Sequence, residues 1–266
     1  MIPGAGLVSD ALHQRAVLNE TEHRPWPLPE GPWLMGQTWV DLLFAHWRVP
    51  EEELRRVVPP QLPLDTYDGS AWLGITPFCV RGLRLRNTAP APVLSSFPEL
   101  NVRTYVSVEG KPGIYFLSLD ADSRAAVAAA RRLYRLPYFH SQIEVSVEGG
   151  AVAYDLMRTS DDGPPGYFGA RYGPEGPELP VREGSLERWL AERYCLYTLD
   201  DEQRIHRGEI HHPPWPLHNA WAEIETNTMA MPLGIELDGE PLLHFAPRQD
   251  VVIWPLRRTN SASAEF

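Results

Sequence analysis

Two side chains that can do chemistry lie on one short stretch of the chain, residues 99–108. Glu99, Asn101, Arg103, Tyr105 and Ser107 fall at every second position, alternating with Leu100, Val102, Thr104, Val106 and Val108. On a β-strand such residues share one face, because successive side chains point to opposite faces. Glu99 and Arg103 would be about 13 Å apart, too far to pair directly but suited to holding opposite ends of a small ligand. A sheet with its polar side in water explains the same alternation equally well.

Histidine is the other residue type suited to proton transfer near neutral pH. His140 follows the end of an expected helix by four residues and is the best-placed histidine for acid–base work, although an ordinary hydrogen-bonded strand histidine fits as well. Four more histidines flank a Pro-Pro-Trp segment: His206, His211, His212 and His218. They lack a His-x-His or His-Glu-x-x-His spacing, so we expect a packed loop and no metal site.

Other reactive patterns are missing from the sequence. There is no Gly-x-Ser-x-Gly motif, and Gly184-Ser185 is better explained as the start of a helix. The glycines in residues 31–36 and 163–176 lack the strand-turn-helix context of a nucleotide loop, so we expect no cofactor. Lys111, the only lysine, lies in a Glu-Gly-Lys-Pro-Gly turn, which predicts a solvent-exposed amine.

The elements that must position these residues are mostly strands. Period-two alternation predicts a hairpin over residues 102–120 and another over 143–156, which turns at Gly149-Gly150. An alanine-rich helix is expected over residues 123–136 and must end before Pro137. Further expected segments are helices at 50–58 and 185–194, strands at 195–199, 222–226 and 251–254, and a loop with at most one strand at 159–181. The fold class is therefore α+β, mainly antiparallel β.

Composition sets the outer limits. A chain of 266 residues with 43% hydrophobic residues can bury a full core. We expect an N-terminal arm (1–32), one β-rich domain (33–257) and a flexible tail (258–266). A net charge of −11 argues against a nucleic-acid partner. Without a signal-like or membrane-spanning stretch, and with Cys79 and Cys195 both expected to be reduced, the predicted location is the cytoplasm, with no membrane partner.

Six blocks in order carry a resemblance to a known family. They span about Trp33 to Pro255 and read Phe44-Ala45-His46-Trp47, Phe97-Pro98-Glu99-Leu100-Asn101-Val102-Arg103-Thr104-Tyr105, Leu136-Pro137-Tyr138, Arg193-Tyr194-Cys195-Leu196-Tyr197, His211-His212-Pro213-Pro214-Trp215 and Pro241-Leu242-Leu243-His244-Phe245. The chain resembles the uncharacterised YqjF-like family of bacterial proteins. A more distant resemblance, to the acetoacetate decarboxylase superfamily, rests on the Val57-Val58-Pro59 segment, on Glu99 and on the alanine-rich helix.

The decarboxylase resemblance implies a β-barrel or cone with a few outer helices and a ligand inside. It also implies a Pro-Lys-Lys motif after the helix, whose lysine forms a Schiff base with the substrate ketone. Here that motif reads Pro137-Tyr138-Phe139, so we expect no lysine-dependent decarboxylation. Glu99 matches an acidic position of the decarboxylase pattern.

These observations favour a protein that binds a small organic, anionic molecule inside the barrel. The predicted ligand-binding residues are Glu99, Arg103, Tyr105, Tyr138 and His140. One alternative is an enzyme that acts on a keto- or carboxylic acid, with Glu99 or His140 as the acid–base group. Another is a structural interaction protein. The expected partner is a small-molecule ligand, and a homo-oligomer is one possible assembly.

Overall fold

One sheet dominates the structure, a computed structural model that describes residues 5–91, 95–161 and 163–259. Within these ranges its strands run in the order β12-β9-β8-β4-β3-β2-β1-β11-β10-β7-β6-β5. The strands are β1 (Met35–Val49), β2 (Ala71–Leu85), β3 (Phe97–Val108), β4 (Lys111–Ala121), β5 (Tyr138–Glu148), β6 (Ala151–Arg158), β7 (Tyr167–Glu178), β8 (Cys195–Leu199), β9 (Ile205–His211), β10 (His218–Asn227), β11 (Leu242–Ile253) and β12 (Arg257–Arg258). The helices are α1 (Ala5–Ala16), α2 (Glu51–Val57), α3 (Arg124–Tyr134) and α4 (Leu186–Ala191), with short 3-10 turns at Val17–Asn19 and Met231–Leu233.

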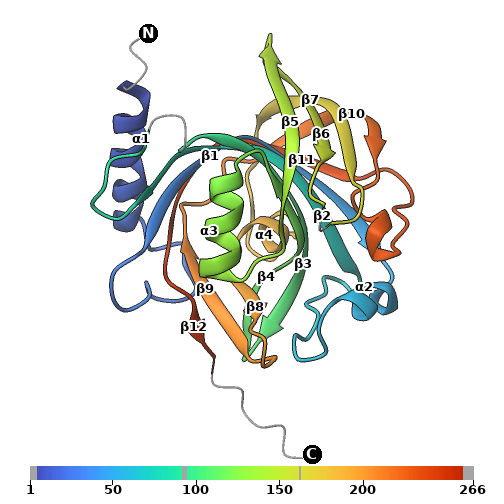
Figure 1. Ribbon diagram of the computed structural model, residues 1–266, viewed down its shortest axis with the longest axis horizontal. Helices are drawn as coiled ribbons and strands as arrows, with labels where there is room; N and C mark the ends of the chain where they lie inside the picture. Colours follow the sequence, from blue (N-terminus) through green and yellow to red (C-terminus); the bar gives the residue numbers. More distant parts are fainter. Residues whose placement is uncertain (1–4, 92–94, 162, 260–266) are drawn as a thin grey trace, which may run out of the picture.

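Two additional pairings close this sheet on itself (Figure 1). A short antiparallel pairing of β9 with β11 closes a first ring, made of β9, β8, β4, β3, β2, β1 and β11. A short parallel pairing of β4 with β5 closes a second ring through β10, β7 and β6. Strands β1–β4 and β11 belong to both rings, and we call them the shared wall. The expected antiparallel β-barrel with a few outer helices is confirmed.

Much of the shared wall is buried on both faces, because one face looks into the first ring and the other into the second. Outside the first ring, α1 covers the start of β1 and the end of β2 instead. On β3, Leu100 and Val102 pack into a hydrophobic cluster with Tyr154 and Phe168 of the second ring. The residues that alternate with them, Glu99 and Asn101, face the first ring. Alternate side chains of β3 therefore point into the first and the second ring, and neither set faces solvent.

Strand β1 changes the face that it presents to the first ring partway along. Gln37 and Trp39 line the cavity described below, and after a break at Asp41 the next lining residue is Leu42. Asp41 has a left-handed backbone (φ 54°), and the register between β1 and β2 shifts across this segment. Such a bulge inserts one residue and reverses the alternation. As a result Leu43 packs into the second ring.

Helix α3 lies across the opening of the first ring (Figure 1). The Ser123 side chain caps its first turn by accepting a hydrogen bond from the Ala126 amide at 3.3 Å. Arg135, in a left-handed conformation (φ 53°), follows its last residue, two positions before Pro137. The expected helix over 123–136 and both expected hairpins are confirmed. The 159–181 segment contains a full strand, β7.

The N-terminal segment packs on the outside of the first ring through α1. Gln14 is completely buried and donates hydrogen bonds to the Thr38 side chain and the Gly82 carbonyl, at 3.2 and 3.1 Å. A Cβ atom at Gly36 would lie 2.5 Å from the Gln14 side-chain oxygen, so any larger residue there would displace the Gln14 side chain. The part of the expected tail at 260–266 lies outside the described residues. Of the helices that the structure describes, none has the length and apolar character needed to span a bilayer.

Candidate functional site

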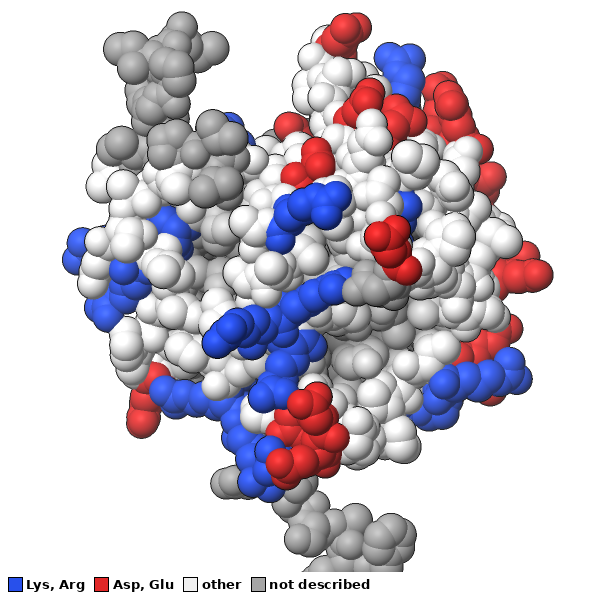
Figure 2. All heavy atoms as spheres, viewed as in Figure 1, with Lys and Arg blue, Asp and Glu red and all other residues white. Residues whose placement is uncertain are grey.

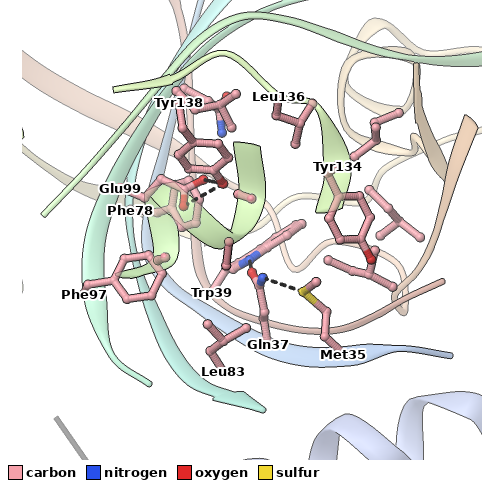
Figure 3. Close-up of a pocket in the computed structure, with 18 of the residues that line it drawn as sticks. Met35, Gln37, Trp39, Phe78, Leu83, Phe97, Glu99, Tyr134, Leu136 and Tyr138 are labelled. Atoms are coloured by element: carbon pink, nitrogen blue, oxygen red, sulfur yellow. Dashed lines mark hydrogen bonds between the residues drawn. The ribbon is translucent and has the colours of Figure 1, made fainter. Parts of the chain in front are cut away.

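The first ring encloses a cavity of about 470 Å³ (Figure 3). Its lining is mostly apolar and comes mainly from the shared wall, from β8 and β9, and from one face of α3, with further residues from the β2–β3 connection, from β5 and from the segments that follow α4 and β9. On α3 the lining residues fall at helical spacing and are mainly small: Ala126, Ala129, Ala130, Leu133 and Tyr134. Among the few charged or polar lining side chains are Glu99, Asn101, Arg103, Tyr138, Arg193 and His212. Mostly apolar walls with a few converging polar groups are typical of a small-molecule site.

Glu99 and Tyr138 form one polar pair on this lining. The Tyr138 hydroxyl donates to the Glu99 carboxyl and lies 3.0 Å from both of its oxygens (Figure 3). Glu99 comes from β3, and Tyr138 is the first residue of β5, placed there by the end of α3 and by Pro137. Burial raises the pKa of Glu99 to about 8, against the lowering effect of the Tyr138 hydrogen bond. Burial and the neighbouring Glu99 raise the pKa of Tyr138 well above its usual range.

Arg103 lies further along the same face of β3. It is 5% exposed, and its guanidinium carbon is 5.0 Å from the centre of the Phe44 ring. No carboxylate of the described residues forms an ion pair with it, and its Nε has no hydrogen-bond partner among them. A buried cation without a counter-ion is costly unless something else supplies the negative charge. Arg103 is therefore well suited to bind an anion inside the cavity.

Arg193, which follows α4, brings a second guanidinium to the same end of the cavity. It is 3% exposed, and its Nη1 is paired with Asp65, while its Nη2 has no hydrogen-bond partner within the described ranges. Its guanidinium carbon lies 4.7 Å from the centre of the Tyr105 ring. Arg103 and Arg193 both reinforce the effect of burial, which lowers the pKa of His46 well below its usual range. Two cations thus lie close to one another here, and among the described residues only Arg193 has a carboxylate partner, Asp65.

Tyr105 does not line the cavity, although it was predicted to bind the ligand. It is completely buried behind the lining, and its hydroxyl lies 2.6 Å from Nε2 of His46. Its ring packs against the guanidinium of Arg193. Tyr105 therefore supports the lining residues from behind.

His140 was predicted to line the barrel interior, and the structure places it elsewhere. It lies in a separate surface groove, where its Nδ1 is 2.9 Å from the Thr159 hydroxyl. Tyr138 and His140 share one face of β5, but α3 lies between them: Ala126 and Ala130 line the cavity, whereas Arg124 and Ala128 line the groove with His140. The strand pattern predicts that Tyr138 and His140 share a face, but it does not predict that α3 packs between them.

The outer face of α3 is basic, on a chain whose net charge is −11. Figure 2 shows Lys and Arg side chains gathered over this helix. The exposed arginines of α3 and of the residue that follows it are Arg124, Arg131, Arg132 and Arg135. Local positive potential beside a cavity favours the approach of an anion.

Lys111 is not solvent-exposed, contrary to the prediction. Its ammonium lies 2.8 Å from both carboxylate oxygens of Glu209, and the side chain is 11% exposed. It also lies 5.2 Å from the centre of the Trp26 ring. The turn was correctly located, but β9 and the N-terminal segment cover it. Lys111 is not among the residues that line the cavity.

We expect borohydride in the presence of acetoacetate to trap no covalent adduct on Lys111. An ammonium held by a carboxylate outside the cavity cannot attack a ketone bound inside it. Intact-mass spectrometry after reduction, followed by peptide mapping, checks this outcome. A lysine-dependent acetoacetate decarboxylase treated in parallel serves as the positive control, and an adduct on Lys111 would overturn the expectation.

Three polar or aromatic lining residues were not among the predicted ligand-binding residues: Arg193, His212 and Trp215. His212 is buried, with its ring nitrogens 2.7 and 3.2 Å from the carbonyls of Pro213 and Arg193, and burial lowers its pKa. The Trp215 indole Nε1 has no hydrogen-bond partner among the described residues. One signal was present for Arg193, because the apolar run Tyr194–Tyr197 follows it directly and a charge beside such a run is a candidate buried charge.

The four histidines near the Pro-Pro-Trp segment do not converge on one point. His206 lies 3.0 Å from Asp200, and His211 lies between Arg24 and the Val17 carbonyl. In the part of the chain that the structure describes, no group of three or more His, Cys, Asp or Glu side chains is arranged to hold a metal ion.

The structure has an acetoacetate decarboxylase-like fold, a mainly antiparallel and partly closed ring with a cavity and a covering helix. The structure is similar to the acetoacetate decarboxylase of Legionella pneumophila, with a TM-score of 0.59 and 15% identity over 93% of this chain and 97% of that chain. It is also similar to the enduracididine biosynthesis enzyme MppR complexed with pyruvate, with a TM-score of 0.60 and 13% identity over 91% of this chain and 95% of that one. At these identities the likeness shows the fold alone.

Sequence comparison gives the family. Residues 36–250 match the DUF2071 family, described as an uncharacterized conserved protein. The chain is also 47% identical to the uncharacterized protein YqjF of Bacillus subtilis (strain 168) over 232 residues, which are 87% of this chain and 95% of that protein. The chain belongs to the DUF2071 family, and the predicted resemblance to YqjF-like proteins is confirmed.

Proposed function

We propose that this protein binds a small organic anion in the cavity of the first ring. The observation that carries the proposal is Arg103, a buried guanidinium that lines the cavity and has no carboxylate partner among the described residues. An anionic ligand group would supply the missing charge and accept the hydrogen bond of the free Nε. Glu99, near the start of β3, and its partner Tyr138 on β5 would contact a second polar group of the ligand.

The structural neighbours agree with this ligand class. By their titles one is an acetoacetate decarboxylase and another is complexed with pyruvate, so both are connected with small keto acids. The cavity argues against the alternative of a purely structural interaction protein, which would favour a filled interior.

Replacing Arg103 by glutamine should weaken the binding of an organic anion by about 1.5–3 kcal/mol, the usual worth of a charge-assisted hydrogen bond. Native mass spectrometry of a keto- and carboxylic acid panel would identify a ligand, and calorimetry would compare its affinity for both proteins. Thermal unfolding of the same samples shows whether the fold is retained. Arg171, on β7 and outside the lining residues, is the matched control, since R171Q should leave binding unchanged. Equal affinities for wild type and R103Q would contradict the proposal.

A second candidate function, an enzyme that moves a proton next to a carbonyl group, is favoured by the raised pKa of Glu99. A carboxyl group with a pKa of about 8 is mostly protonated at neutral pH and can donate a proton to a carbonyl oxygen. Tyr138 would hold it in position. Turnover of a keto-acid panel, lost in Glu99→Gln and retained in His140→Gln, would support catalysis. Binding without turnover by the wild type would leave the protein as a binder.

A further inference from the structure

The cavity runs from an apolar rim to a cationic floor. Leu85 and Leu133 line it and are 52% and 50% exposed, so the cavity opens to solvent beside them. Arg103 and Arg193 line it and are at least nine-tenths buried. Along β3 the lining residues follow the same order, with Phe97 first and Arg103 last. At the entrance the lining Arg84 is hydrogen-bonded to Gln14 and to the Ala11 carbonyl, whereas the charged donors without a partner among the described residues lie at the far end.

The floor offers a built site for one carboxylate. Arg103 Nε and Arg193 Nη2 are buried donors without a partner among the described residues. The Trp215 indole Nε1, also on the lining, is a third such donor. Buried donors of this kind are rare in native proteins and call for an explanation. A carboxylate presents two oxygens with several acceptor positions, which matches a set of two guanidiniums and an indole.

The body of the cavity has a different chemistry. The lining side chains labelled in Figure 3 are largely apolar and include Met35, Phe78, Leu83, Phe97 and Leu136. The lining alanines of α3 have small side chains, which leave space in the cavity for a ligand. A ligand limited to a carboxylate and one or two further carbons would leave most of this apolar surface without a contact.

From this polarity we infer that the ligand is an amphipathic organic acid, with its carboxylate between Arg103 and Arg193 and its apolar body extended toward Leu85 and Leu133. This inference rests on the proposed function and adds three things to it: a second anion-binding residue, the direction in which the ligand enters, and an apolar body. It separates this cavity from one made for a two- or three-carbon acid.

Calorimetry of the full-length protein with acetate, butyrate, hexanoate and octanoate, and with the four matching primary amides, tests the inference. We expect affinity to rise by about fourfold for each added methylene group, the factor that burial of one CH₂ gives. The octanoate anion should bind at least tenfold more tightly than octanamide. Replacing the rim residue Leu133 by glutamate should weaken octanoate and leave butyrate unchanged.

Two variants test the floor. Arg193→Gln should weaken octanoate at least tenfold without changing the affinity for octanamide. Arg193→Gln also removes the partner of Asp65, so a second variant, Asp65→Asn, is needed. It keeps the Arg193 guanidinium and removes the carboxylate that competes with the ligand for it. Octanoate should therefore bind more tightly to Asp65→Asn than to the wild type.

The possible failures can be told apart. If acetate binds as tightly as octanoate and Arg103→Gln abolishes both, the amphipathic ligand is wrong and the proposed function stands. If acids bind no better than amides, both are wrong. Chain-length dependence that Arg193→Gln and Asp65→Asn leave unchanged would overturn the role of Arg193.

Discussion

Replacing Arg158 by methionine is expected to lower the free energy of unfolding by about 3–5 kcal/mol, because it leaves a buried carboxylate without its counter-ion. Arg158 on β6 donates two hydrogen bonds of 2.7 Å to Asp120 on β4, one to each carboxylate oxygen. Their side chains are 2% and 0% exposed. Ser141 on β5 donates a further hydrogen bond of 2.7 Å to Asp120. The cluster therefore joins the strands at which the second ring closes.

Urea unfolding of wild type and Arg158→Met measures this loss. The matched control is an exposed ion pair, Arg135 with Asp201, whose charged atoms lie 3.9 Å apart. Asp201→Asn should leave the free energy of unfolding nearly unchanged, since solvent screens that pair. A double variant with Asp120→Leu and Arg158→Met should recover part of the loss, because it removes both charges. A loss below about 1 kcal/mol in the single variant would show that the pair contributes little.

The second large effect is a pH dependence of stability that Glu99 should impose. Its pKa rises from an ordinary value of 4.5 to about 8 in the folded protein. Between these two values the folded state holds a proton that the unfolded state has released. The free energy of unfolding therefore falls as the pH rises from about 5 to 8, by at most about 1.4 kcal/mol per pH unit from this group. Above about pH 9 both states are ionised and the contribution is constant.

Glu99→Gln removes this titration and keeps an acceptor for the Tyr138 hydroxyl. Denaturant unfolding of both proteins from pH 5 to 9 should show a difference in stability that grows steadily in favour of the variant and then levels off. Other titrating groups are common to both proteins and cancel in the comparison. Parallel curves across the whole range would mean that Glu99 ionises as an ordinary surface carboxylate does.

The sequence predicted elements that have one solvent-facing side, and also the hairpin of β3 and β4, where the two buried faces of β3 differ in polarity. Strands β5 and β6 alternate clearly because one of their faces is exposed, and α3 has an alanine-rich composition, a serine cap and a following proline. The long strands β1 and β2 were not predicted. Both belong to the shared wall, and eight successive residues from Ala71 to Phe78 are buried, so no period of two is visible there. The bulge at Asp41 removes the remaining regularity in β1.

The site divides in the same way. Glu99 and Arg103 could be grouped from sequence because they lie on one strand, where spacing alone determines their common face. Arg193 and Trp215 come from segments 90 and 112 residues further along the chain than Arg103, and only the closure of the first ring brings them near it. The prediction that His140 lines the interior was wrong for the opposite reason. Tyr138 and His140 share a face of β5, but α3 lies between them.

The shared wall has a thermodynamic consequence for recognition. Leu100 and Val102, which alternate with Glu99, Asn101 and Arg103, pack into the interior of the second ring. The backbone of β3 is therefore fixed from that side and cannot readjust. The conformational entropy of these side chains is therefore lost when the protein folds and not when a ligand arrives. A preorganised site of this kind gives a larger net affinity for the same contacts. It also discriminates sharply against ligands of the wrong shape, because β3 cannot shift to accommodate them.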